Sequence, residues 1–176
     1  LIARALVIRS LDQQQIVQSS QILETRTNLV SYGLQPFLTQ AGALSSTPQL
    51  QAAVRDLSAR ALARVTIIAP DGRVLADSAV SDSNLAAVEN HRERPEVQQA
   101  IATGRGTDLS TSRTTGERTL YFAVGLSSPN QAIPTVFLRL GLPMTTFNHE
   151  VDKLHQDLAL AFGIAFLIAV ALSVWL

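Results

Sequence analysis

Three basic side chains, His91, Arg92 and Arg94, stand just before a predicted helix that begins at Pro95. The first backbone amides of a helix have no internal acceptors, and the helix dipole is positive at that end, so anions bind there. Arginine adds a guanidinium group that holds a carboxylate or phosphate through two hydrogen bonds. These three residues are therefore candidate ligands for an anionic molecule.

The same segment also has a structural interpretation, which we favour. Asn90 and Arg94 would hold the irregular residues 78–90 in place, while Glu93 and Glu96 would neutralise the arginines. Acidic side chains among basic ones weaken the attraction for an anion. The sequence therefore leaves the binding and the structural roles as alternatives.

Two further arginines and a tyrosine lie on three predicted strands or directly after them. Arg113, Tyr121 and Arg139 could share one face of a sheet, where their polar groups would gather. Arg139 stands between Leu138 and Leu140, so strand alternation points its side chain to the face opposite theirs. Without a ligand, Arg139 would be an ion-pair partner and Tyr121 a core aromatic with its hydroxyl at the edge.

Other kinds of site have little support in the sequence. His149 and His155 are six residues apart, which places them on different faces of a helix, and His91 is remote in the chain, so we predict no metal. There is no cysteine and no Gly-x-Ser-x-Gly element for a nucleophile. Asp71 and Asp77 are interpreted as turn and strand-end residues. We expect no catalytic residue and no cofactor in this chain.

Composition limits the fold and excludes one class of partner. Lys plus Arg and Asp plus Glu each number 14, so no strong positive field attracts nucleic acid. Apart from its apolar C-terminal stretch, the chain has about 157 residues, enough for one domain. We therefore expect one hydrophobic core and no nucleic-acid partner.

Residues 1–44 are predicted to form one long membrane-proximal helix, because no glycine or proline occurs before Gly33. Residues 1–8 could be the end of a first transmembrane segment, and Pro36 would kink the other end of the helix. A seven-residue spacing gives the helix an apolar stripe that packs on a partner helix or on the domain behind it. The stripe consists of Ile16, Leu23, Val30 and Phe37.

Residues 45–144 are predicted to form an α+β domain with a five-stranded antiparallel sheet and flanking helices. One helix would start at Pro48 and another at Pro95, the second ending at Gly104. The first two strands would form a hairpin through Pro70-Asp71-Gly72. Strands four and five are apolar in long stretches, as expected for central strands with helices against one face. The strands, in the order β-β-α-β-β-β, are 64–69, 73–77, 107–112, 118–126 and 135–142.

The last 19 residues, 158–176, contain no charged side chain. A helix of this length spans roughly 28 Å, close to the ~30 Å hydrocarbon core of a bilayer. We therefore predict a transmembrane helix, preceded by a juxtamembrane helix over 145–157 that follows strand five without a break. Because the chain starts at Leu1 and stops within this apolar stretch, we interpret it as a fragment of a longer membrane protein.

Three stretches carry a resemblance to a known family: RVTIIAPDGRVLADS (64–78), ENHRERPEVQQAI (89–101) and STSRTTGERTLYFAVGL (110–126). Together they resemble the extracytoplasmic sensor region of transmembrane histidine kinases of the phosphate-regulon sensor type. The resemblance covers roughly residues 11–176 and implies a PAS-like or Cache-like sheet. In related small-molecule sensors, residues on this sheet face the ligand, which implies such a role for Arg113, Tyr121 and Arg139.

The resemblance also implies a biological setting. It implies a homodimer in the bacterial cytoplasmic membrane, in contact with the lipid bilayer, with the sensor domain on the extracytoplasmic side. An unknown small molecule or protein would be the signal. Kinase domains beyond Leu176 would use ATP and Mg²⁺ and pass a phosphoryl group to a response regulator. Alternatives are the sensor of a chemoreceptor or cyclic-dinucleotide synthase, or a membrane-tethered interaction module that does not switch. A membrane-bound hydrolase is a more distant alternative.

Overall fold

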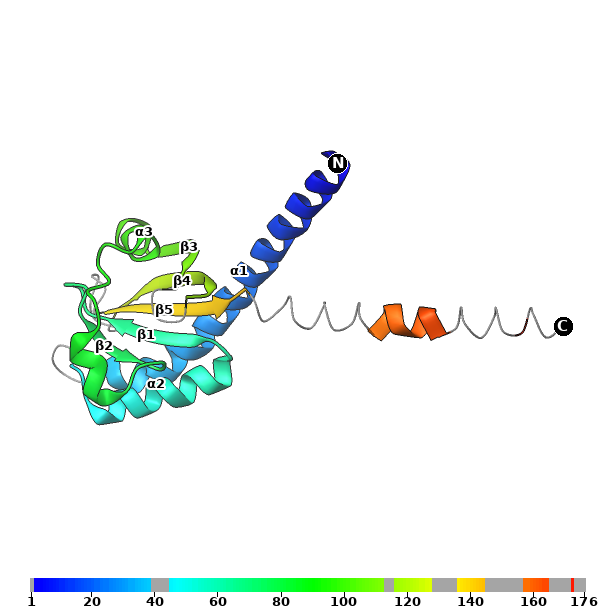
Figure 1. Ribbon diagram of the computed structural model, residues 1–176. Helices are drawn as coiled ribbons and strands as arrows, with labels where there is room; N and C mark the ends of the chain where they lie inside the picture. Colours follow the sequence, from blue (N-terminus) through cyan, green and yellow to red (C-terminus); the bar gives the residue numbers. More distant parts are fainter. Residues whose placement is uncertain are drawn as a thin grey trace. The chain divides into compact units, whose positions relative to one another are not determined.

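The computed structural model describes residues 2–38, 45–112, 116–127, 136–144, 157–164 and 172. The chain divides into two compact units, Leu1–Leu142 and Pro143–Leu176. The first unit contains all the named helices and most of the sheet, and it is described first (Figure 1).

Two helices precede the sheet. α1 (Ile2–Leu38) continues through Pro36, and α2 (Pro48–Ala61) begins after the N-cap Thr47, whose hydroxyl accepts a hydrogen bond from the Leu50 amide at 3.1 Å. α1 packs on α2 and on β4 of the sheet. Its buried stripe includes the predicted Leu23 and Val30, and it continues through Leu34 and Leu38. The domain behind the helix therefore covers this stripe.

The predicted order of strands and helices is confirmed, with one addition. A short 3-10 helix, η1 (Asp82–Ala87), lies within residues 78–90, where the sequence predicts no regular element. α3 (Pro95–Thr103) ends at Gly104, as predicted. The strands are β1 (Arg64–Ile68), β2 (Val74–Asp77), β3 (Arg105–Thr111), β4 (Arg118–Leu126) and β5 (Val136–Pro143).

The five strands form one sheet in the order β2-β1-β5-β4-β3. β1 pairs antiparallel with both β2 and β5, and β3 pairs antiparallel with β4. The hairpin between β1 and β2 turns at Gly72, whose φ of 89° lies in the left-handed region that glycine adopts without strain. The last strand in sequence, β5, is therefore the central strand of the sheet.

The helices cover both faces of the sheet, whereas the sequence predicts them on one. α1 and α2 lie on one side and the short α3 on the other (Figure 1). α3 is held by a small apolar cluster that joins it to β1, β4 and β5: Ile68, Val97, Ala100, Ala123 and Phe137. Long apolar strands alone do not reveal which face a helix covers, because both faces of a central strand are buried.

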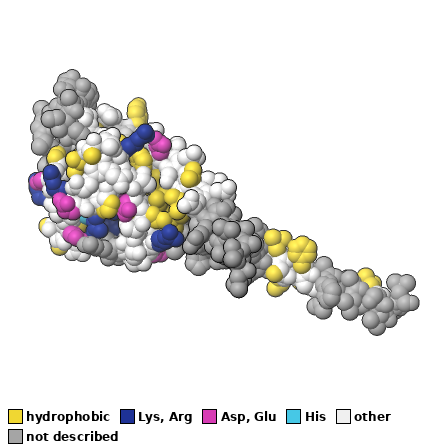
Figure 2. Space-filling model, turned by 90° about the horizontal axis from the view of Figure 1, so that it is seen from above, with side chains coloured by type: hydrophobic (Ala, Val, Ile, Leu, Met, Phe, Trp, Pro, Cys, Tyr) yellow, Lys and Arg dark blue, Asp and Glu magenta, His cyan; other side chains and the backbone are white. Residues whose placement is uncertain are grey.

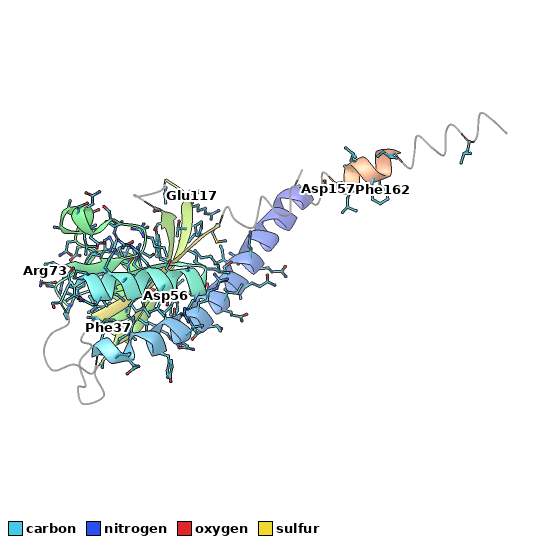
Figure 3. The ribbon with its side chains drawn as sticks, turned by 90° about the horizontal axis from the view of Figure 1, so that it is seen from below. Phe37, Asp56, Arg73, Glu117, Asp157 and Phe162 are labelled. Carbon is cyan, nitrogen blue, oxygen red and sulfur yellow. The ribbon has the colours of Figure 1, made fainter. Side chains whose placement is uncertain are left out.

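In the second unit the structure describes a helical segment at residues 157–164. Figure 3 labels Asp157 and Phe162 on it, and Figure 2 shows its surface to be largely hydrophobic. Phe162 is 72% exposed. Within the described residues, no helix has both the length and the apolar character needed to span a membrane. The predicted juxtamembrane helix and most of the predicted transmembrane helix, at 145–156, 165–171 and 173–176, lie outside the described residues.

Candidate functional site

A row of polar side chains crosses the α3-covered face of the sheet. The strand register places Thr66 of β1 opposite Asp77 of β2 on one side and opposite Arg139 of β5 on the other. Residues directly opposite one another in a sheet point to the same face. Tyr121 of β4 continues the row, because the Arg139 guanidinium lies 3.6 Å from the centre of its ring. Four strands therefore bring polar groups together on one face of the sheet.

One ion pair of this row is almost fully buried. The Arg139 Nε donates a hydrogen bond to Oε1 of Glu96, on α3, at 2.5 Å, and the two side chains are 6% and 1% exposed. The ring of Tyr121 contacts the guanidinium from β4 as a cation–π partner. A charge in such a position is stable only when it is paired, so this contact fixes α3 on the central strand.

A second ion pair lies at the other end of the row. Arg64 donates two hydrogen bonds to the Asp77 carboxylate, at 3.0 and 2.9 Å. The Thr66 hydroxyl and the Ala79 amide also donate to this carboxylate, at 2.8 and 2.9 Å. Asp77 is 0% exposed. Its carboxylate therefore accepts four hydrogen bonds from three residues, and it orients Arg64.

A pocket of about 490 Å³ opens beside Arg64, between β1 and residues 79–94. Small apolar side chains form part of its wall, and its polar lining consists of Arg64, Ser81, Asn84, Glu89, His91 and Arg94. Arg94 Nη2 pairs with Glu89 Oε2 at 3.0 Å. Two guanidinium groups, each with a carboxylate partner, therefore line one concave surface together with an imidazole.

His91 connects the pocket to the buried polar row. It lines the pocket, yet it is only 6% exposed, and its Nδ1 has no hydrogen-bond partner among the described residues. Burial lowers the pKa of His91 to about 4, and the nearby cations Arg139, Arg94 and Arg64 act in the same direction while Asp77 opposes them. The imidazole is therefore neutral at pH 7.

We expect acid to destabilise the domain through His91. Its folded-state pKa of about 4 lies below the ordinary value of 6.5, so the unfolded chain binds the proton more tightly. The contribution of neutral His91 to the free energy of unfolding is fully present above pH 6.5 and is lost as the pH falls towards 4. Between pH 7.5 and 5 the loss is about 2 kcal/mol, from roughly 1.4 kcal/mol per pKa unit. Urea unfolding of wild type and His91→Gln at several pH values gives the free energy of unfolding of each protein, and the loss due to His91 is the difference between them. If both proteins showed the same dependence on pH, the prediction would be wrong.

The structure separates the predicted site residues into groups. His91 and Arg94 line the pocket, whereas Tyr121 and Arg139 belong to the buried row behind it. Arg92 is exposed and donates to the Pro70 carbonyl at 2.6 Å, away from the pocket lining. Arg113 lies outside the described residues.

The structure partly supports the structural interpretation of this segment. Asn90 holds it through a hydrogen bond from Nδ2 to the Asp71 carbonyl at 3.0 Å. Glu96, however, neutralises Arg139 of β5 and not an arginine of its own segment, and Arg94 is paired with Glu89. The sequence alone does not indicate Arg64 or Glu89 as site residues. Basic and acidic residues at the edges of elements give no signal of their own, because only the fold brings them together.

The described residues contain no group of three His, Asp or Glu side chains that could hold a metal ion. The groups that converge on the pocket are hydrogen-bond donors and paired charges, which suit a small polar molecule. The arrangement offers a concave surface in which Arg64 comes from β1, opposite Gly141 of β5, and in which His91 is near enough to Arg139 for that charge to affect its pKa.

No protein-family model matches the chain, and no curated protein matches it. Solved structures do. An extracellular ligand binding receptor from Desulfohalobium retbaense DSM5692 matches with a TM-score of 0.56 at 10% identity, over 74% of this chain and 24% of that chain. The ligand-binding domain of the Campylobacter jejuni chemoreceptor Tlp3, in complex with L-norvaline, matches with a TM-score of 0.52 at 11% identity, over 74% and 53%.

The sensor domain of the V. cholerae histidine kinase DctB gives a TM-score of 0.47 at 18% identity, over 80% of this chain and 57% of that one. At these identities the first two likenesses show a shared fold. The predicted α+β fold with a five-stranded antiparallel sheet and flanking helices is confirmed. The chain spans between 24% and 57% of the length of these three structures.

Proposed function

We propose that this domain is the signal-sensing part of a membrane-bound receptor, and that its signal is a small molecule carrying a carboxylate or phosphate group. The observation that carries the proposal is the pocket that Arg64, His91 and Arg94 line together. Guanidinium groups bind such anions through paired hydrogen bonds, and a neutral imidazole adds a polar contact without a charge.

The fold supports this proposal. The two solved structures that share it are described as an extracellular ligand binding receptor and as the ligand-binding domain of a chemoreceptor. A fold alone does not determine function, so the argument depends on the pocket and its chemistry. The shared fold adds that a sheet of this kind, with helices around it, serves ligand binding in other proteins.

A physical route leads from the pocket to the end of the domain. His91 lines the pocket and is near enough to Arg139 for that charge to lower its pKa, and Arg139 is on β5, which ends at Pro143. A ligand that moves His91 or Arg94 changes the environment of the central strand. The chain continues from this strand into the apolar residues 158–176. We propose that these residues anchor the protein in a membrane and that displacement of β5 is the output.

The receptor type is also part of the proposal. From the sequence resemblance we propose an extracytoplasmic sensor of a dimeric histidine kinase of the phosphate-regulon sensor type. Its cytoplasmic part would use ATP and Mg²⁺ and act on a response regulator. The fold shared with the Tlp3 domain favours a chemoreceptor as the second candidate. Both are signalling receptors in which an outer domain controls an inner one.

The test compares two neighbouring arginines. Arg94 lines the pocket and Arg92 does not. We expect calorimetric titration of the full 176-residue chain in mild detergent to detect binding of at least one anion among acetate, pyruvate, succinate and inorganic phosphate. Arg94→Gln should lower that affinity about 10- to 100-fold, the usual effect of losing a charged hydrogen bond. Arg92→Gln removes the same charge and should change it less than about twofold.

Two results would contradict the proposal. One is the absence of binding for every anion in the set. The other is an equal loss of affinity in Arg92→Gln and Arg94→Gln, because it would mean that the anion responds to the general field and not to the pocket.

A further inference from the structure

The two arginines of the pocket differ in how firmly their carboxylate partners are held. The partner of Arg64 is Asp77, which is fully buried and receives four hydrogen bonds. The partner of Arg94 is Glu89, whose side chain is 54% exposed, while Arg94 itself is 21% exposed. Separating the first pair would leave a buried charge unpaired, whereas water can solvate Glu89 if it leaves the second.

The segment that carries Glu89 is lightly attached to the domain. Between Ser81 and Asn90, Leu85 is the one buried side chain. The segment is tied near its ends, where Gln51 donates to the Val80 carbonyl at 2.9 Å, Arg55 forms an exposed ion pair with Asp82, and Asn90 donates to the Asp71 carbonyl at 3.0 Å. A segment with few buried apolar contacts moves at low cost in free energy. Glu89 is therefore a charged group on a wall of the pocket that is held by few buried contacts.

The Glu89 carboxylate has the same chemistry as the ligand group proposed above. It already forms with Arg94 the ion pair that a ligand carboxylate or phosphate would form. Glu89 and Arg94 line the same pocket. A ligand anion and the Glu89 carboxylate therefore cannot both pair with the same edge of the Arg94 guanidinium. A tethered group competes at a high effective concentration, which an external ligand must overcome.

We propose that Glu89 is a built-in competitor for the ligand: its carboxylate occupies Arg94 in the empty domain, and the bound anion displaces it. This inference rests on the proposed function, because it assigns the ligand anion to Arg94. Displacement of Glu89 releases its segment from the pocket. The domain thus has a closed state, with Glu89 on Arg94, and a ligand-bound state in which Glu89 faces solvent.

The test compares two glutamates that differ in their contact with Arg94. Glu89→Gln removes the competing charge, and Glu93→Gln removes an equal charge from an exposed position nearby. Calorimetric titration of the full chain in mild detergent with acetate, succinate and inorganic phosphate gives the affinities. We expect Glu89→Gln to bind anions about 3- to 5-fold more tightly than wild type, the upper part of the range for a partly exposed ion pair. Glu93→Gln should stay within about twofold of wild type.

The outcomes separate this inference from the proposed function. If wild type binds an anion but Glu89→Gln binds it no more tightly, the competitor role of Glu89 is refuted, whereas the proposal that the pocket binds anions is kept. Weaker binding in Glu89→Gln refutes it as well and indicates that Glu89 contacts a cationic group of the ligand, which titration with alanine or valine would reveal. An equal gain in anion affinity in Glu93→Gln also refutes the competitor role, because the gain then comes from the change in net charge and not from the contact with Arg94. If neither wild type nor Glu89→Gln binds any anion, both proposals fail.

Discussion

Replacing Arg139 with methionine is expected to destabilise the domain by about 3–5 kcal/mol, the usual cost of leaving a buried charge without its partner. Glu96 is 1% exposed, and its Oε2 already has no hydrogen-bond partner among the described residues. Without Arg139 its Oε1 would lose the guanidinium at 2.5 Å, and Tyr121 would lose its cation–π partner. Urea denaturation at pH 7 measures the change in the free energy of unfolding.

Two variants make this prediction specific. The double variant Glu96→Leu/Arg139→Met removes both charges and should recover much of the lost stability, since apolar pairs replace buried ion pairs at little cost. Arg60→Met breaks an exposed pair with Asp56, whose side chains are 68% and 59% exposed. It should change stability by less than about 1 kcal/mol. If Arg139→Met behaved like Arg60→Met, Glu96 would not need its partner, and our account of how α3 is fixed would be wrong.

Replacing Gly106 with alanine is expected to cost about 3 kcal/mol, at the upper end of the usual range for overpacking. A Cβ added at Gly106 of β3 would lie 2.1 Å from the backbone carbonyl oxygen of Glu96 and 2.6 Å from the Cβ of Gln99. A backbone atom cannot rotate away, so the whole of α3 must shift from the strand. That shift also pulls Glu96 from Arg139. Thermal and urea unfolding measure the loss.

Gly33 provides a matched control for Gly106. A Cβ at Gly33 would also overlap a neighbour, the Cδ2 of Leu57 at 2.4 Å, but this atom is the far end of a flexible side chain. Alanine in place of glycine also stabilises a helix by about 1 kcal/mol. Gly33→Ala should therefore stay within about 1 kcal/mol of wild type. Equal losses in the two variants would show that the close approach of α3 to β3 is not the cause.

Local signals in the sequence predicted most of the fold. Pro48 and Pro95 mark the starts of helices, Gly104 marks an end, and Pro70-Asp71-Gly72 marks the hairpin, all through conformations that these residues adopt within one turn of chain. The distribution of helices over the two faces of the sheet was not predictable in this way. It depends on packing such as that at Gly106, where the missing side chain admits α3.

The candidate site was predictable only in part, for a related reason. His91 and Arg94 are predicted as site residues because they stand before a helix, and both line the pocket. The sequence does not predict the ion-pair partners. Arg64 pairs with Asp77, 13 positions away, and Arg139 pairs with Glu96, 43 positions away. Charge alone does not select a partner, because any acidic residue is equally plausible until strand register fixes the distances. The ligand roles of all six predicted residues stay predictions.

The position of β5 at the centre of the sheet has a consequence for biosynthesis. The two hairpin-like halves, β1 with β2 and β3 with β4, are joined into one sheet only by the strand that emerges last. Until residues 136–143 have left the ribosome, each half exposes an unpaired edge, and such edges invite aggregation. The nascent chain therefore completes its core in one late step, at the moment when the apolar residues behind β5 are about to follow.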